Sequence, residues 1–198
     1  MKKYDTFIIG HVSLDEIITH NGERKKGIGG AVIYSSHSAI AGGNKVGILT
    51  KISREDSFLL DLLYLKNEDV YILPFSKTTM IRNHYLSEDS ERRTCTALSI
   101  ADPFKIEDIP DVSSEVFHLA GLITGDFDDG LIKHLSMKGK VAVDVQGFIR
   151  TPQNGEMVYK DWENKRELLP YIHYLKTDAA EAEIITGCSN TRDAAKIL

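Results

Sequence analysis

Cysteine is scarce in this sequence, with only Cys95 and Cys188 among 198 residues. The two lie far apart, and neither belongs to a Cys-x-x-Cys pair or has a histidine nearby at ligand spacing. Disulfide-stapled domains and structural zinc sites both need closely spaced cysteines. The sequence therefore indicates neither, and it predicts two reduced thiols in a cytoplasmic protein.

Long hydrophobic runs and clustered positive charge are also missing. The apolar run in MKKYDTFIIG is too short for a signal peptide, and no stretch approaches the roughly 20 apolar residues of a membrane-spanning helix. Acidic residues (29) outnumber Lys and Arg (24), and we interpret the basic group Arg24-Lys25-Lys26 as a solvated turn. Because sequence-independent nucleic-acid binding needs clustered basic residues, we expect neither nucleic acid nor a membrane as a partner.

The sequence does contain a regular alternation of short apolar runs and helical patterns. The runs are typical of strands buried on both faces of a parallel sheet; they lie at 6–9, 45–49, 70–73, 116–120, 141–143 and 172–175. Helical patterns lie between the runs, at 31–41, 55–66 and about 131–135, and further helices are expected near Asp161 and Asp178. This alternation predicts a doubly wound α/β fold with a mostly parallel sheet.

Two stretches break the alternation. Residues 17–23 look like a hairpin tip with Asn-Gly as the turn, and 78–101 contains two strand-like runs around a polar turn at 87–91. None of these strands is followed by a helix. We expect a small β-sheet lid, with strands at about 14–28 and 78–101, inserted in one domain over 1–198. Its edge or apolar face would be exposed, so a homodimer through the lid sheet is a candidate assembly.

Three glycines in four residues open the segment GIGGAVIYSS, at 27–36. Glycine before a helix often allows a close backbone approach to a ligand such as a phosphate. A dinucleotide site needs GxGxxG directly after the first strand, and a P-loop needs Gly-Lys-Ser/Thr, and this segment meets neither requirement. An NAD-dependent oxidoreductase, which the alternation alone would allow, therefore ranks low.

Four motifs in order carry a resemblance that spans essentially the whole chain. Gly10-x-x-x-x-Asp15, a hairpin, Gly29-Gly30 entering a helix, DVQGFIR (144–150) and KTDAAEAEIITG (176–187) together resemble the N-terminal part of the ribokinase-like (PfkB) carbohydrate kinases. GHVSLDEI, GGAVIYSS and DVQGFIR are most similar to the inositol-kinase-like branch. The resemblance implies a ribokinase-like kinase that uses ATP and Mg²⁺ to phosphorylate a hydroxyl of a sugar or cyclic polyol.

The first three motifs would hold the acceptor. The resemblance implies that Asp15 accepts hydrogen bonds from substrate hydroxyls, a task suited to an acceptor-only carboxylate. Gly29 and Gly30 would let the backbone approach the substrate, and Tyr34 stands where many family members carry Asn. The alternatives are a surface acid at Asp15, a tight turn at the glycines and simple packing at Tyr34.

Further acceptor contacts are expected from the lid and from DVQGFIR. In TTMIRNHYL, Arg82 and His84 share one strand face while Asn83 and Tyr85 share the other, and one face would close over the substrate. Gln146 and Arg150 follow a buried strand, and open α/β sheets bind ligands at the carboxyl ends of their strands. Arg150 would contact substrate or phosphate, or form a structural salt bridge.

Asp178 and Glu181 occupy the positions of the family's Asn and Glu, so the resemblance implies that they organise Mg²⁺ and phosphate. Asp178 replaces an amide with a carboxylate, which would attract Mg²⁺ but repel donor phosphates. The alternative is that both are acids favoured at a helix N-terminus. The sequence indicates no dedicated protein metal site.

The family's catalytic aspartate, in a Gly-Ala-Gly-Asp loop, has no counterpart in residues 1–198. Residues 191–198 begin a helix without a C-terminal cap. We therefore expect the chain to be a fragment, inactive alone, whose catalytic Asp lies beyond Leu198. The alternative is a non-catalytic ribokinase-like protein that binds a polyol or a partner.

Overall fold

The computed structural model describes residues 1–63, 65–75, 77–88 and 93–198. Its main sheet has six strands in the order β12-β9-β8-β1-β4-β5, and every pairing is parallel. The strands are β1 (Lys2–Ile9), β4 (Val46–Ser53), β5 (Val70–Phe75), β8 (Val112–Leu119), β9 (Lys140–Asp144) and β12 (Tyr174–Lys176). Each of the six predicted apolar runs overlaps one of these strands, and the runs at 45–49, 116–120 and 172–175 begin or end one or two residues outside it.

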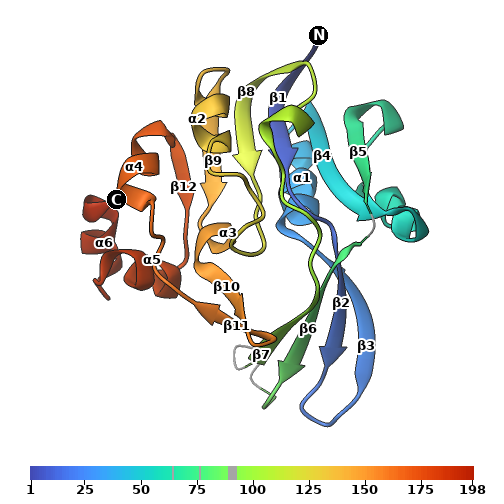
Figure 1. Ribbon diagram of the computed structural model, residues 1–198, viewed down its shortest axis with the longest axis vertical. Coiled ribbons are helices and arrows are strands. Elements are labelled where there is room, and N and C mark those ends of the chain that lie inside the picture. Colours follow the sequence, from blue (N-terminus) through green and yellow to red (C-terminus); the bar gives the residue numbers. More distant parts are fainter. Residues whose placement is uncertain (64, 76, 89–92) are drawn as a thin grey trace.

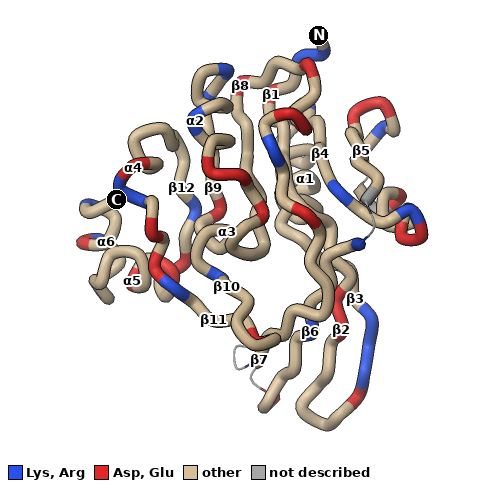
Figure 2. Tube along the Cα trace, viewed as in Figure 1, with Lys and Arg blue, Asp and Glu red and all other residues tan. Residues whose placement is uncertain are grey.

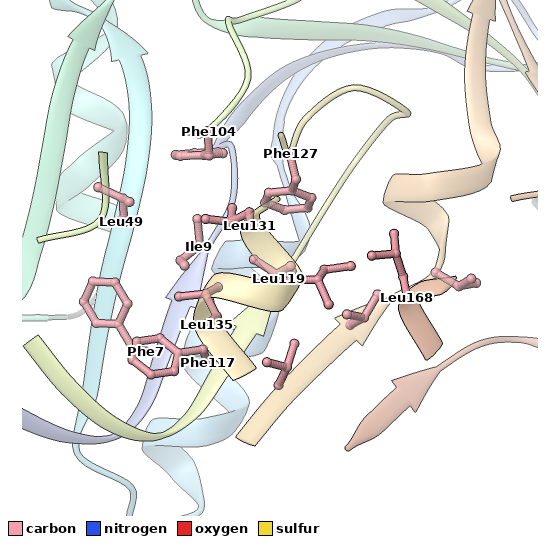
Figure 3. Packing of buried hydrophobic residues seen from close by; sticks show 14 of the residues in the cluster. Phe7, Ile9, Leu49, Phe104, Phe117, Leu119, Phe127, Leu131, Leu135 and Leu168 are labelled. Carbon is pink, nitrogen blue, oxygen red and sulfur yellow. The ribbon is translucent and has the colours of Figure 1, made fainter. Parts of the chain in front are cut away.

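Apolar side chains cover both faces of this sheet because neighbouring strand residues point to opposite sides. Phe7 and Ile9 join one buried cluster, whereas Ile8 joins a second. The first cluster packs beneath α2 (Leu131–Ser136) and the chain around Leu168, as Figure 3 shows, and the second lies beneath α1 (Ala31–Ala41). Layers on both faces confirm the predicted doubly wound α/β fold.

A second sheet projects from the main one, with the order β10-β11-β7-β6-β2-β3 (Figure 1). Its strands are β2 (Ser13–Ile18), β3 (Arg24–Gly29), β6 (Thr79–Tyr85), β7 (Arg93–Ser99), β10 (Arg150–Gln153) and β11 (Glu156–Tyr159). The predicted hairpin joins β2 to β3, and the turn predicted at 87–91 lies partly outside the described residues. The hairpin β10–β11, joined to β7 at Glu156, is an addition that sequence reasoning missed.

The helices differ from expectation in one place. The segment predicted as a helix over 55–66 is a 3₁₀ helix, η1 (Arg54–Leu63), in which Leu59 and Leu63 are buried while Phe58 is 55% exposed. The carboxylate of Asp56 accepts hydrogen bonds from hydroxyls on both sides of it in the chain, at Ser53 and Thr78. These contacts tie the first turn of η1 to the end of β4 and to the segment that enters β6.

The remaining helices have 3 to 11 residues, and all but the last two, which follow β12, lie between strands. They are α1 (Ala31–Ala41), η2 (Asn67–Asp69), η3 (Ile106–Asp108), α2 (Leu131–Ser136), α3 (Gln146–Ile149), α4 (Lys165–Leu168), η4 (Leu169–Tyr171), α5 (Ala179–Thr186) and α6 (Thr191–Ile197). Side chains of Asp178 and Asn190 cap α5 and α6. Among the described residues, no helix has the length and apolar character needed to cross a membrane.

Candidate functional site

A cleft of about 660 Å³ lies where the second sheet meets the carboxyl ends of the main-sheet strands. Second-sheet residues, the start of α1 and the ends of β8, β9 and β12 line it. The lining consists of Ser13, Asp15, Gly29, Gly30, Ala31, Tyr34, Ser35, Ser38, Ile81, Asn83, Arg93, His118, Leu122, Asp144, Gln146, Arg150 and Lys176. The strand register thus brings together segments that are distant in sequence.

Asp15 presents its carboxylate on the cleft side of β2. The Ser13 hydroxyl donates to Asp15 Oδ1 at 2.9 Å, and the Asn83 amide nitrogen lies 3.5 Å from Oδ2. Burial raises the pKa of Asp15, although the Ser13 hydrogen bond and the charges of Arg150 and Arg93 oppose that shift. An ionised carboxylate held this way can accept hydrogen bonds from ligand hydroxyls.

The glycine pair joins β3 to α1 directly beside this carboxylate. A Cβ on Gly29 would lie 2.6 Å from Asp15 Oδ2, so any other residue would displace the carboxylate. Gly30 has φ of 109°, and a Cβ there would collide with the carbonyl oxygen of His11. The turn itself therefore requires both glycines, and both also line the cleft.

Tyr34 lies one turn into α1, on the cleft wall, with 63% of its surface exposed. Simple packing does not account for so exposed a ring. The serines of the same helix that line the cleft, Ser35 and Ser38, add polar groups to this wall.

Gln146 and Arg150 lie at the ends of α3, immediately after β9, as the sequence predicts. Arg150 is buried, and its Nε donates to the carbonyl oxygen of Leu122 at 2.8 Å. The Gln146 backbone N–H donates to Asp144 Oδ1 at 3.3 Å. Arg150 also opens β10, so it links the main-sheet crossover to the second sheet.

The structure does not bring Arg82 to the cleft. Its Nε donates to Glu16 Oε2 at 2.6 Å on the outer face of the second sheet. The period-2 pattern offered two faces, and the cleft-facing one carries Asn83. Beside it lies Arg93, whose Nη1 donates to the Tyr85 hydroxyl at 3.2 Å.

Asp178 and Glu181 also lie off the cleft, engaged with each other. The Glu181 N–H donates to Asp178 Oδ1 at 2.7 Å, and the Asp178 N–H donates to Glu181 Oε2 at 2.9 Å. This capping box matches the alternative interpretation of helix-terminal acids. The side chain that does line the cleft from this segment is Lys176, whose Nζ lies 3.2 Å from Asp144 Oδ1.

Sequence reasoning missed several cleft residues, namely His118, Asp144 and Lys176 on main-sheet strands and Arg93 on β7. The first three lie at or near the carboxyl ends of predicted strands, which is the signal that could have found them. Burial lowers the pKa of His118 although Asp144 opposes the shift. Partial burial acts to lower the pKa of Lys176, but the charges of Asp144 and Glu181 outweigh it and the pKa is raised.

The donor set for a divalent cation is sparse. Among residues that the structure describes, no group of three or more His, Cys, Asp or Glu could hold a metal ion. Mg²⁺ in phosphate-transfer sites usually needs only one or two carboxylates together with substrate phosphates. Asp144 at the cleft fits that modest role, whereas Asp178 and Glu181 are engaged in the cap of α5.

The fold and the cleft define a class: α/β proteins whose second sheet covers the carboxyl edge of a parallel sheet. No model of a known protein family matches the sequence. The cytidine kinase of Thermococcus kodakarensis (strain ATCC BAA-918 / JCM 12380 / KOD1) is 31% identical over 206 aligned positions, covering 98% of this chain and 68% of that protein. At this identity and coverage, the chain belongs to the ribokinase family of kinases.

Solved structures agree with this assignment. A pyrophosphate-dependent kinase in the ribokinase family, complexed with a pyrophosphate analog and myo-inositol, is 35% identical with a TM-score of 0.84. That match covers 97% of this chain and 68% of the other. The ribokinase of Cryptococcus neoformans var. grubii serotype A in complex with ADP is 10% identical with a TM-score of 0.69, covering 97% of this chain and 64% of the other, and supports the fold alone.

Proposed function

We propose that the chain carries the acceptor-binding part of a kinase that transfers a phosphoryl group to a hydroxyl of a sugar or cyclic polyol. The observation that carries this proposal is the Asp15 carboxylate, oriented by Ser13 and pressed against the Gly29–Gly30 turn at the cleft. A polyol offers several hydroxyl donors, and the cleft offers matching acceptors and donors around one carboxylate. The 35% identical relative bound to myo-inositol supports the same class of acceptor.

In this proposal the cleft residues act by positioning the acceptor. Asp15 would fix one acceptor hydroxyl, and Gln146, Arg150 and the Tyr34 wall would fix the rest of the ring, which leaves another hydroxyl free to react. That hydroxyl oxygen bonds to the donor's terminal phosphorus, the bond from phosphorus to the leaving oxygen breaks, and the hydroxyl proton passes to a base. The family resemblance assigns the base to an aspartate that has no counterpart among residues 1–198. Phosphoryl transfer depends mainly on such positioning and on charge stabilisation.

We propose ATP with Mg²⁺ as the donor, because the resemblance to the ribokinase-like kinases implies this pair. Mg²⁺ would neutralise charge on the transferred group, and Asp144 and Lys176 line the end of the cleft where the main-sheet strands terminate. We propose no direct phosphate contact for Asp178 and Glu181, and instead a role in fixing the segment that carries Lys176. Because one relative uses pyrophosphate, ATP and pyrophosphate are both to be assayed.

The test uses the protein as its gene encodes it, with myo-inositol, ribose and cytidine as acceptors. Asp15→Asn should lower kcat/KM for the acceptor about 100-fold, since loss of acceptor positioning costs on this order. Glu16→Gln is the matched control, because Glu16 is adjacent in β2 but faces outward and pairs with Arg82 and Arg24. Turnover unchanged in Asp15→Asn would remove Asp15 from the site. Acceptor binding without turnover by the native protein would favour the binding-only alternative.

A nucleoside is the second candidate acceptor, and Tyr34 is the observation that favours it. An exposed aromatic ring on the wall of a polar cleft can stack on a base, and such stacking contributes about 1–3 kcal/mol. The 31% identical relative is a cytidine kinase, which supports a nucleoside as the acceptor. Tyr34→Ala should weaken cytidine binding more than myo-inositol binding if the base stacks there. Equal effects would favour a polyol.

We also propose a homodimer through the outer face of the second sheet. Leu14, Ile28 and Met80 are cross-strand neighbours there, beside the Glu16–Arg82 ion pair. Basic residues occupy the first half of the edge strand β3, as Figure 2 shows. Their charge disfavours strand pairing between two copies along that edge. Sedimentation should therefore show a dimer that Ile28→Asp dissociates. A wild-type monomer would contradict the proposal.

A further inference from the structure

Three buried polar atoms stand out beneath the cleft. Among the described residues, His11 Nδ1, His11 Nε2 and Asp126 Oδ1 are the only buried side-chain nitrogen or oxygen atoms without a hydrogen-bond partner. Buried polar groups are almost always satisfied, and those that are not often mark functional sites. Both side chains are essentially fully buried, at 0% and 1% exposed.

The two residues lie in the segments that follow two adjacent parallel strands, His11 after β1 and Asp126 after β8. His11 Nε2 and Asp126 Oδ1 are 3.8 Å apart. The His11 ring packs on Phe104 with centroids 4.5 Å apart. Nearby charges are Lys51, which is paired with Asp108 at 2.7 Å, Asp102 and Arg150. Burial lowers the pKa of His11 and raises that of Asp126, so burial acts against charge on either side chain.

The second carboxylate oxygen of Asp126 is fully used. Oδ2 accepts the N–H groups of Leu122 at 2.7 Å and of Ile123 at 3.2 Å. The Leu122 carbonyl in turn accepts Arg150 Nε at 2.8 Å, and the Arg150 carbonyl accepts the Thr124 N–H at 2.8 Å. One carboxylate thus shapes the segment 122–126 that holds the buried guanidinium at the cleft.

The backbone of His11 contacts the glycine turn on the other side of the cleft. Its carbonyl oxygen lies directly under Gly30, so close that a Cβ on Gly30 would collide with it. Gly30 and Gly29 form the turn that abuts Asp15. The buried pair therefore contacts the supports of both Arg150 and Asp15.

We propose that His11 and Asp126 are a positioning pair, in which Asp126 sets the Arg150 guanidinium through Leu122 and His11 supports the glycine turn at Asp15. Neither residue lines the cleft, so neither touches the substrate. The pair fixes the spacing between the two charged groups that hold the acceptor. Its kinetic consequence rests on the proposed kinase function, whereas its structural consequence does not.

The structural test is hydrogen exchange at arginine Nε–H, followed by ¹⁵N NMR on the isotope-labelled protein. Asp126→Ala removes the oxygen that accepts the Leu122 and Ile123 N–H groups, and it should speed exchange at Arg150 Nε–H at least about tenfold. Asp126→Asn keeps a carbonyl oxygen for the Leu122 N–H and should preserve the protection seen in the wild type. Asp129→Ala is the matched control, because Asp129 is an exposed acid three residues further on. Asp126→Ser takes the place of Asp126→Ala if the alanine variant does not fold.

The kinetic test uses the same variants with whichever acceptor the wild type turns over. Asp126→Ala should raise KM for that acceptor about tenfold with kcat changed less than about threefold, and Asp126→Asn should restore KM. The proposal is overturned if Asp126→Ala leaves both exchange and KM unchanged, or if Asp126→Asn loses as much as Asp126→Ala. If the wild type turns over no acceptor, the proposed function fails, while Arg150 exchange still decides this inference.

Discussion

The two sheets of this protein are of equal strand number but have opposite character. The main sheet is parallel and carries buried apolar clusters on both faces. Within the six strands of the second sheet, Ile81 is the single apolar side chain that is buried. One sheet is thus stabilised by its core, while the other carries polar groups on its inner face and both apolar side chains and an ion pair on its outer face. The difference separates the part that stabilises the fold from the part that we propose selects a ligand.

The largest expected effect is the loss of stability caused by a cavity in the core of the main sheet. Phe117 is fully buried on β8 and packs edge-on against Phe7, with ring centroids 6.1 Å apart. Phe117→Ala should lower the free energy of unfolding by about 3–5 kcal/mol, measured by urea denaturation. The matched second-sheet variant, Leu98→Ala on β7, removes a 38% exposed side chain and should cost far less. Equal losses would contradict the division between the sheets.

The next effect concerns the point where the sheets join. Gly30→Ala places a Cβ against the His11 carbonyl at a φ of 109°, so it should lower stability by about 1–3 kcal/mol. It should also weaken acceptor binding, because the turn abuts Asp15. Gly43→Ala is the control, since Gly43 also has positive φ (82°) but no atom would lie within 4 Å of its Cβ. Stability and binding that match the wild type in Gly30→Ala would show that the turn tolerates a side chain.

Acidification should weaken the main sheet through His118. Burial lowers the pKa of His118 in the folded protein below its ordinary value of 6.5. As pH falls below 6.5, the unfolded chain therefore binds a proton that the folded chain does not, and stability is lost. His118→Asn should reduce the slope of unfolding free energy against pH, between about 6.5 and 5, by at most about 1.4 kcal/mol per pH unit. Identical slopes in His118→Asn and the wild type would show that His118 does not contribute to the pH dependence of stability.

The smallest effect is expected on the outer face of the second sheet. Arg82 and Glu16 form a partly exposed ion pair there, and exposed pairs contribute about 0–1 kcal/mol. Arg82→Ala should therefore change stability by less than about 1 kcal/mol and leave acceptor KM unchanged. A large rise in KM would return Arg82 to the acceptor site, where the sequence alone had placed it.

The contrast between the sheets also explains how far the sequence could predict the structure. Continuous apolar runs identify buried parallel strands, so all six main-sheet strands and α1 were predicted. The hairpin β10–β11 was missed because its strands have four residues each and include Pro152, although Asn154-Gly155 is a turn signal. For η1, the apolar spacing predicted an ordinary helix, and the contacts of Asp56 with Ser53 and Thr78 are tertiary information.

The candidate site divides in the same way. Asp15, Gly29, Gly30, Tyr34, Gln146 and Arg150 line the cleft, and each follows a strand end or a turn with a recognisable pattern. Their contact with the acceptor stays a prediction. Arg82 lies on the outer face, away from the cleft. Period-2 alternation gives two faces and does not say which one is inward. Arg93 and the His11–Asp126 pair could not be predicted, since cross-strand register brings them to the cleft or beneath it.

The most direct test of the central claim is a ¹⁵N–¹H titration of the protein with the acceptor that supports turnover. If the acceptor binds between the sheets, the amide signals that shift should be those of Ser13, Asp15, Gly29, Gly30 and Tyr34, while the exposed turn at Gly22 stays unchanged. Loss of these shifts in Asp15→Asn, but not in Glu16→Gln, would complete the assignment. Shifts confined to residues outside the cleft, with an acceptor that is still phosphorylated, would contradict it.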